Sequence, residues 1–331
     1  MILKDREVSM ILKKLLALDG RMYKDHFEEA RVHNDLQKKL AERRGEEAVD
    51  FYLQFLDQKL FHFLLSIRIP DEQGFFQIDT LTLSPYFILI IEIKNWRGTI
   101  LFGENGQVIR VREDGTEEGF QNPIPQAYLQ RHRLQKWLQL KGINNIPIYC
   151  MVVISFPSTI IKPITQQQIP KEVIHSNQLS FKINALADKH DQVISMDDID
   201  LIAKQLIAEH TPEDKDILSA YNVQKKQLIK GVICDNCSYH PMIWHRSKMF
   251  CPKCKFTSTN SFLHAIQDYS LLISNEAKNK ELRDFLQIDS PHIMKRLMLK
   301  LGFDYFGTTN GRKYILNNEV IPDKIIYERK S

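Results

Sequence analysis

The sequence has no long uninterrupted hydrophobic run. The apolar run FILIIEI at 87–93 contains Glu92 and is far shorter than the roughly 20 apolar residues of a membrane-spanning helix. The first residues, MILKDREVSM, carry charge from the fourth position onward and lack an apolar segment with a cleavage site, so no secretory signal is evident. With 331 residues, 43% of them hydrophobic, the chain can bury a large core divided over two or three domains. We expect a soluble, cytoplasmic protein without membrane contacts.

Cysteine is also scarce, and four of the five cysteines are confined to one short stretch. They form the pairs CDNC at 234–237 and CPKC at 251–254, separated by 13 residues, while Cys150 stands alone in the apolar run IPIYCMVVIS. In a cytosolic chain this placement predicts a metal site and one buried thiol rather than two disulfides. Four thiolates fill the tetrahedral shell of one Zn²⁺ and leave no open position, so this zinc would be structural. The predicted ligands of this zinc ribbon are Cys234, Cys237, Cys251 and Cys254.

The net charge of the chain is small, but its distribution is uneven. The formal total is +4, whereas residues 225–331 contain 18 Lys and Arg against 10 Asp and Glu. A basic carboxy-terminal third fits a polyanionic partner such as nucleic acid. A solvated basic surface without such a partner explains the charge as well.

The order of the predicted elements indicates an α/β fold. The first 58 residues have helical spacing of Leu and Ile, with turns at Gly20 and Gly45. Four runs rich in Ile, Leu and Phe follow, separated by turn residues, and predict consecutive antiparallel strands. A helix with prolines in its first turn and a buried strand come next, which gives a mixed sheet flanked by helices. The expected strands cover 61–69, 75–83, 86–94, 98–102 and 146–155, and the later helices cover 122–140, 196–210 and 212–230.

Two of these strands carry charges that an ordinary buried strand does not carry. Asp79 lies in the second strand, and Glu92 and Lys94 lie in the third. Burial of a carboxylate is costly unless a cation or hydrogen bonds compensate it. Alternation along the strand places Glu92 and Lys94 on one face, and hairpin pairing would bring Asp79 beside Glu92, within reach of one Mg²⁺. A buried ion-pair network without any ligand explains the same residues equally well.

A set of motifs around these charges resembles a known nuclease family. The motifs are Gly45-Glu46, QIDTL around Asp79, EIKNW at 92–96 and NPIPQ at 122–126. In order and spacing, residues 44–154 resemble the PD-(D/E)xK nuclease superfamily and, more specifically, the nuclease-related domain called NERD. One position departs from the pattern, because Ile78 stands where the superfamily name has proline. The resemblance implies a restriction-endonuclease-like fold.

The same resemblance implies a catalytic ion, Mg²⁺ or Mn²⁺, and the residues that hold it. Asp79 and Glu92 would be its ligands, together with the main-chain carbonyl of Ile93. Lys94 would be the catalytic lysine, placed to position or deprotonate the attacking water.

Two helical residues would face the same site by this resemblance. Glu46 lies on the helix before the sheet, and Gln126 lies on the helix after it. Each has an alternative role. Glu46 can serve only the helix dipole, with Glu47 as the competing site residue, and Gln126 can belong to a solvated polar strip.

The residues beyond the cysteines predict a small basic element. Two amphipathic helices, the second capped by Ser290, precede a short hairpin whose turn is TTNGRK. This order resembles a winged helix, although a helical packing domain with an exposed basic side is an equal alternative. The side chains available for phosphate contacts are Lys295, Arg296, Lys300, Arg312 and Lys313.

Together these features predict a metal-dependent enzyme that hydrolyses phosphodiester bonds of nucleic acid, with DNA as the expected substrate. The alternative is a nucleic-acid-binding or scaffolding protein whose nuclease fold is inactive. The expected division is N-terminal helices at 1–44, the nuclease-like domain at 45–211, a helical linker at 212–230, the zinc ribbon at 231–260 and the basic winged-helix-like element at 261–331.

Overall fold

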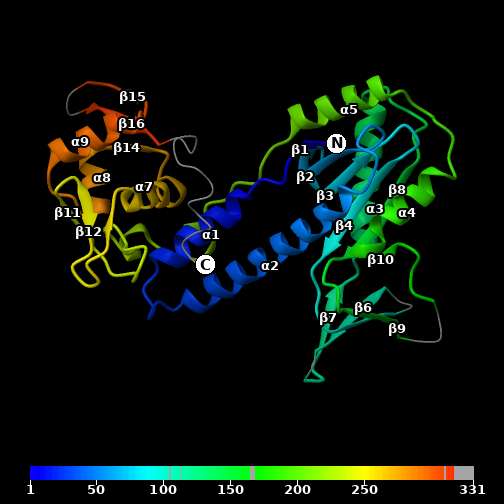
Figure 1. Cartoon of the computed structure of the whole chain (residues 1–331), viewed down its shortest axis with the longest axis horizontal. Coiled ribbons are helices and arrows are strands. Elements are labelled where there is room, and N and C mark those ends of the chain that lie inside the picture. Colours follow the sequence, from blue (N-terminus) through cyan, green and yellow to red (C-terminus); the bar gives the residue numbers. More distant parts are fainter. Residues whose placement is uncertain (104–105, 113, 165–167, 309–310, 317–331) are drawn as a thin grey trace. The chain divides into compact units, whose positions relative to one another are not determined.

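The computed structural model describes residues 1–331 except 104–105, 113, 165–167, 309–310 and 317–331. The chain divides into two compact units (Figure 1). The first unit combines Met1–Glu7 with Lys39–Pro212, and the second combines Val8–Lys38 with the described part of Glu213–Ser331. Residues 8–38 therefore belong with the carboxy-terminal part of the chain, and the functional domain boundaries stay a prediction.

The first unit is built on a six-stranded mixed sheet of the order β1-β2-β3-β4-β8-β10. The strands β2, β3 and β4 are antiparallel to one another, whereas β1 is parallel to β2 and β8 is parallel to both β4 and β10. The predicted mixed sheet is confirmed. The strands span Ile2–Lys4 (β1), His62–Asp71 (β2), Gly74–Leu83 (β3), Ile88–Lys94 (β4), Ile148–Ile154 (β8) and Val173–His175 (β10).

Helices cover both faces of this sheet, so its inner strands are apolar on both sides. On one face, Ile90 packs in a core with Leu134 of α3 (Pro123–Leu140) and Leu206 of α5 (Met196–Glu209). On the other face, Ile91 packs with Val49 of α2 (Glu29–Leu53) and with α4 (Leu179–Ala187). The alternation of a strand explains why consecutive Ile and Leu residues of β4 enter two different cores.

A second sheet holds a strand that we expected in the first. The run 98–102 was predicted to continue the antiparallel series, but β5 (Thr99–Phe102) instead lies between β6 (Gln107–Val111) and β9 (Ile160–Pro163). The free edge of β4 is taken by parallel pairing with β8, and Gly98, at φ +89°, turns the chain away. The fourth strand of this sheet is β7 (Glu117–Gln121).

Two expectations for the amino-terminal region were wrong. Residues 2–4 form the edge strand β1 rather than part of a helix, since their backbone pairs with β2, and α1 (Met10–Arg21) begins only after the Ser9 cap. The expected turn at Gly45 does not exist, because this glycine lies inside α2. Both errors arise from contacts with residues distant in sequence, which local patterns do not contain.

The predicted continuous helix over 212–230 was also wrong. The structure has only α6 (Ile217–Ala220) and a 3-10 turn at Lys225–Gln227. Asn222 between them adopts φ +52°, a left-handed conformation that ends a helix.

The second unit contains a small three-stranded sheet, whose strands lie close in sequence to the cysteine pairs, and a helical part with a second small sheet. We call this helical part, from α7 to β16, the winged-helix arrangement. The first sheet of the unit has the order β11-β12-β13, followed by the elements α7, β14, α8, α9, β15 and β16, in which β16 lies between β14 and β15. Ser290 caps α9 as predicted, with Pro291 at its first position. The predicted hairpin turn includes residues 309–310, which lie outside the described residues. The bounds are Ile243–His245 (β11), Lys248–Phe250 (β12), Thr257–Ser258 (β13), Ser261–Leu272 (α7), Glu276–Lys278 (β14), Asn279–Leu286 (α8), Pro291–Lys300 (α9), Tyr305–Phe306 (β15) and Lys313–Ile315 (β16).

Candidate functional site

The charged residues of β3 and β4 lie side by side, as hairpin pairing predicts. Thr80 pairs with Ile91, and the Asp79 carboxylate accepts a hydrogen bond of 2.9 Å from the main-chain N–H of Ile93. Glu92 is buried, with 3% of its surface exposed, and accepts a hydrogen bond of 2.6 Å from Lys94 Nζ. The structure therefore brings two carboxylates and one ammonium group together at the end of β4.

The helix α3 carries a fourth predicted residue to this place. Asn122 caps its start, because its Oδ1 accepts a hydrogen bond of 2.9 Å from Ile124 N, and Pro123 fills the first position, where no N–H is needed. This start places Gln126 in the first turn, where its Oε1 lies 3.4 Å from Lys94 Nζ. The NPIPQ motif thus fixes an amide against the lysine.

Glu46 approaches the same region from α2, and an arginine holds it there. Arg6 Nη1 lies 3.2 Å from Glu46 Oε2, and the same guanidinium binds both oxygens of Asp50 at 2.8 and 2.9 Å. It also donates to Ser66 Oγ at 2.7 Å and to Thr80 Oγ1 at 2.9 Å. Arg6, in the segment after β1, is the buried cation around which these elements meet.

Sequence reasoning missed Arg6 because it lies far from the motifs. One signal was available. Glu46 and Asp50 are four residues apart on one helical face, and two acids turned toward a core require a cation. The pattern did not say which of the 45 Lys and Arg residues would supply it.

Burial changes the ionisation of the acids in this cluster. Removal from water raises the pKa of Glu92 to about 7, and repulsion from Asp79 adds to this effect while Lys94 opposes it. Burial likewise raises the pKa of Glu46 to about 7, against the attraction of Arg6. The pKa of Asp79 is raised too, first by burial, although the N–H of Ile93 counteracts the shift. The cluster therefore holds more negative charge than its own cations stabilise.

The donor set fits a divalent ion of the Mg²⁺ type. Two cations, Arg6 and Lys94, face the carboxylates of Glu46, Asp50, Asp79 and Glu92, which leaves two negative charges uncompensated when all are ionised. The carboxylates are not gathered into a closed cage within 4.8 Å. In proteins Mg²⁺ typically binds one or two carboxylates and keeps several waters.

Gly45 sets the distance between α2 and the end of β4. A Cβ atom at this position would meet Asn95 Cβ at 2.5 Å and Ser155 Oγ at 2.6 Å. Asn95 in turn donates to the Ala41 carbonyl of α2 at 2.6 Å and accepts from Ser155 Oγ at 3.2 Å. The glycine permits the close approach that places the next residue, Glu46, at the site.

Substitution of Gly45 by alanine should destabilise the first unit. Alanine favours a helix over glycine by about 0.5–1 kcal/mol, but the clash with Asn95 and Ser155 should cost about 1–3 kcal/mol. Gly20, in α1, is the matched control, since nothing lies within 4 Å of its added Cβ. Urea unfolding should show Gly45→Ala less stable and Gly20→Ala slightly more stable than the parent. Equal stability of Gly45→Ala and the parent would contradict the close-approach role.

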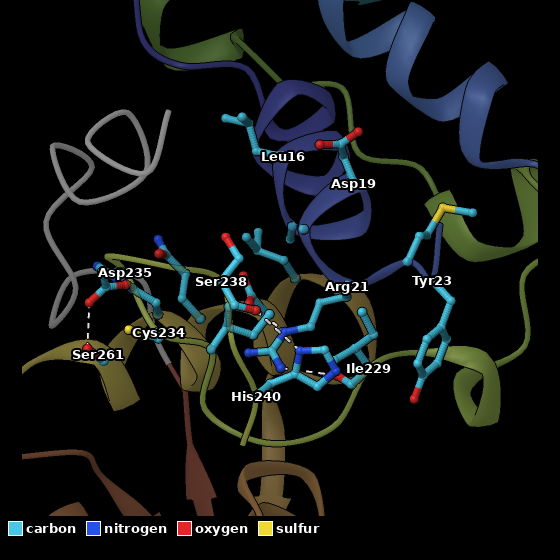
Figure 2. Close-up of a pocket in the computed structure, with 18 of the residues that line it drawn as sticks. Leu16, Asp19, Arg21, Tyr23, Ile229, Cys234, Asp235, Ser238, His240 and Ser261 are labelled. Carbon is cyan, nitrogen blue, oxygen red and sulfur yellow. Dashed lines mark hydrogen bonds and ion pairs between the residues drawn. The ribbon is translucent and has the colours of Figure 1, made fainter. Parts of the chain in front are cut away.

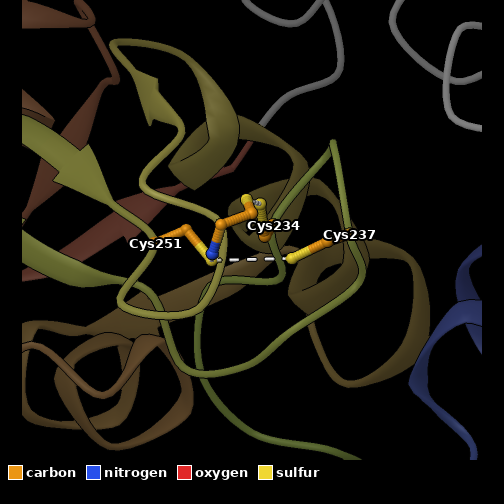
Figure 3. A group of neighbouring side chains, drawn as sticks. Cys234, Cys237 and Cys251 are labelled. Atoms are coloured by element: carbon orange, nitrogen blue, oxygen red, sulfur yellow. Dashed lines mark hydrogen bonds between the residues drawn. The ribbon is translucent and has the colours of Figure 1, made fainter.

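The four clustered cysteines of the second unit converge as predicted (Figure 3). The sulfurs of Cys234 and Cys254 lie 3.6 Å apart, as do those of Cys237 and Cys251. A tetrahedral zinc with Zn–S bonds of about 2.3 Å requires about 3.8 Å between sulfurs. In the described part of the chain they are the one group of three or more metal-ligating side chains whose donor atoms all lie within 4.8 Å. The arrangement is compatible with a zinc ribbon.

The fifth cysteine is separate from this group. Cys150, in β8, is partly buried, and its thiol lies 3.4 Å from the Ala127 carbonyl. Burial raises the pKa of Cys150 to about 11, so its thiol stays protonated at neutral pH.

The predicted phosphate-binding residues all belong to the winged-helix arrangement. Those on α9 are exposed, namely Lys295, Arg296 and Lys300. Arg312 stacks 4.0 Å over the ring of Tyr305, and Lys313 pairs with Glu276 at 3.0 Å. The three helical residues are thus available to a partner, whereas the two on the β16 side already have contacts within the unit.

A comparison with protein families identifies part of the first unit. A family model described as the nuclease-related domain, NERD, matches residues 41–155. The chain carries a nuclease-related domain. The matched part of this domain runs from α2 to the residue after β8 and contains Glu46, Asp79, Glu92, Lys94 and Gln126, whereas Arg6 lies outside it. No curated protein and no solved structure matches the chain.

None of the helices in the described ranges has both the length and the hydrophobicity needed to cross a bilayer.

Proposed function

We propose that the nuclease-related domain hydrolyses phosphodiester bonds of nucleic acid, DNA in particular, with Mg²⁺ or Mn²⁺ as cofactor. The observation that carries this proposal is the uncompensated negative charge beside Lys94. Asp79 and Glu92 are adjacent and partly or wholly removed from water, and both have raised pKa values. A purely structural ion-pair network would match its charges, because unmatched buried charge lowers stability.

Each residue of the cluster would have its own role in this reaction. Asp79, Glu92 and the carbonyl of Ile93 would hold the ion, which supplies a bound water of lowered pKa and neutralises charge on the phosphate. Lys94, held by Glu92 and Gln126, would orient the attacking water through its ammonium group. Glu46, whose pKa is about 7, would accept a proton near neutral pH.

The second unit would bind the substrate in the cytoplasm, where its thiols remain reduced. We propose that the four cysteines hold a structural Zn²⁺, and that Lys295, Arg296 and Lys300 contact phosphates from the exposed side of α9. Arg312 and Lys313 would add contacts from the β16 side. Phosphate contacts of this kind position a protein on nucleic acid without reading its sequence.

A cleavage assay tests the proposed reaction. Purified protein is incubated with supercoiled, linear duplex and single-stranded DNA, and with RNA, in Mg²⁺ or Mn²⁺. We expect cleavage of DNA that stops on addition of EDTA and returns when the divalent ion is added in excess. If neither ion supports cleavage of any of these substrates, the enzymatic function is wrong.

The second candidate is a nucleic-acid-binding protein with an inactive nuclease fold. The winged-helix arrangement favours it, because its exposed basic helix does not depend on the acids of the first unit. If this candidate function is right, binding of nucleic acid should weaken steeply as the salt concentration rises and should be unchanged by Asp79→Ala. No cleavage should be detected.

A further inference from the structure

A cavity of about 590 Å³ lies within the second unit, and none of the residues that line it belongs to α9 or to the nuclease-related domain. Its walls come from α1, the first cysteine pair and α7. Figure 2 shows Leu16 and Arg21 of α1 on one wall, and Asp235 and Ser261 on another. Pockets that bind small molecules typically have volumes of about 300–1,000 Å³, so this cavity has the size of a ligand site.

Apolar side chains and flat rings make up much of the lining. Leu16 and Ala17 of α1 face the cavity together with Leu271 of α7. Four residues with planar rings line it as well: Tyr23, His33, His240 and His264. Walls of this kind favour a ligand with a flat, largely apolar body.

The charges of the lining are already matched within the protein. Arg21 and Asp268 form a buried ion pair at 2.7 Å, with 1% and 4% of their side chains exposed. Asp235 binds His264 at 2.9 Å, and Asp19 binds His33 at 2.9 Å. Every aspartate of the lining thus has a cationic or imidazole partner, which disfavours a highly charged ligand such as a triphosphate.

The side-chain amide of Gln267 has no such partner among the residues that line the cavity. Gln267 of α7 has only 3% of its surface exposed, and within the described ranges its side-chain amide has no hydrogen-bond partner. Its amide atoms are not among the fully buried side-chain atoms that lack a partner, so they are open to the cavity, where a ligand can bind them. The amide presents donors and an acceptor in one plane, the pattern that glutamine uses to bind the edge of a nucleobase.

We propose that this cavity binds a neutral planar heterocycle with an adjacent donor and acceptor, the chemistry of a nucleobase or nucleoside. Its rings stack on the ligand, the apolar wall covers the ligand's faces, and Gln267 binds its edge. The proposal does not depend on the nuclease function, because no residue of the lining belongs to the nuclease-related domain.

Calorimetric titration of the full, zinc-loaded chain tests the site. The probes are adenosine, guanosine, cytidine and uridine, with indole as a flat apolar comparison. We expect at least one nucleoside to bind with one-to-one stoichiometry and a Kd below about 1 mM. Gln267→Leu should weaken this binding tenfold or more. Gln205→Leu, at a glutamine of α5 that lies outside this cavity and whose buried side-chain oxygen has no partner, should leave it unchanged.

The stability of the ligand-free variant gives a second readout. Leucine is similar in size to glutamine and removes no hydrogen bond within the described part of the protein, so the Tm of Gln267→Leu should be close to that of the parent or above it. A lower Tm would mean that the amide has a structural role and would overturn the proposal. The proposal is also overturned if all four nucleosides fail to bind at millimolar concentration, or if indole and the nucleosides bind the parent and Gln267→Leu alike.

Discussion

Asp79→Asn is expected to lower the rate of DNA cleavage by about a hundredfold to a thousandfold. Asp79 supplies one of the two strand carboxylates beside Lys94, and its oxygen is held by the Ile93 N–H at 2.9 Å. Asparagine keeps the shape of the side chain and can accept the same hydrogen bond, but it removes the negative charge that attracts the divalent ion. The rate should fall at saturating DNA, measured from the time course of plasmid cleavage in Mg²⁺.

The same substitution should leave the first unit at least as stable as the parent. The raised pKa of Asp79 means that its buried charge opposes folding at neutral pH, so a neutral side chain relieves repulsion with Glu92 and Glu46. Residues that serve function often lower the stability of a protein, so their replacement can reduce activity and raise stability together. Urea unfolding gives the comparison.

Asp71→Asn provides the matched control. Asp71 ends β2 in the same sheet, but its partner is Arg133 rather than the acid cluster. We expect Asp71→Asn to cleave at nearly the parent rate. If Asp79→Asn cleaves as fast as Asp71→Asn, then Asp79 has no part in the reaction and the ion site is wrong.

The strands of the candidate site were predictable because their information is local. Charges at Asp79, Glu92 and Lys94 interrupt otherwise apolar runs, and the two-residue period of a strand determines their faces. The short connection between β3 and β4 leaves little choice but antiparallel pairing, which puts Asp79 beside Glu92. The Asn-Pro start of α3 is also a local signal, and it indicated that Gln126 lies in the first turn of this helix.

Arg6 and Gly45 were not predictable in this way because their roles depend on distant residues. Arg6 reaches Asp50 and Thr80, which are 44 and 74 positions away. Gly45 has the signature of a turn in the sequence, and only the approach of Asn95 and Ser155 shows that it serves a helix contact. The apolar stripe of α1 likewise predicted a helix but not its packing partner, α7, more than 200 residues later.

The cysteine pairs show the opposite case, since their spacing alone predicted a group that the structure assembles. The structure also shows why this group affects the stability of more than the ribbon. Cys234 and Cys251 are buried in one hydrophobic core together with Phe262 of α7, Leu282 of α8 and Met294 of α9. The ribbon therefore has no separate core, and the winged helix shares the one that the metal would organise.

Cys251→Ser should consequently remove the proposed zinc and destabilise the whole second unit by several kcal/mol. Cys251 is fully buried, and binding of structural zinc contributes about 10–16 kcal/mol in zinc-finger peptides. Elemental analysis should show the loss of one zinc per chain. Hydrogen exchange should rise throughout 231–260 and in α7, α8 and α9, while the sheet of the first unit stays protected.

Cys150→Ser is the control for loss of a thiol, because Cys150 lies in β8 of the first unit and outside the cysteine cluster. It should retain the full zinc content. Unchanged zinc in Cys251→Ser would contradict the ribbon assignment. Faster exchange confined to 231–260 would instead show that the winged helix folds without the metal. The shared core argues against that outcome, because a ribbon that unfolds exposes the apolar faces of the helices packed on it.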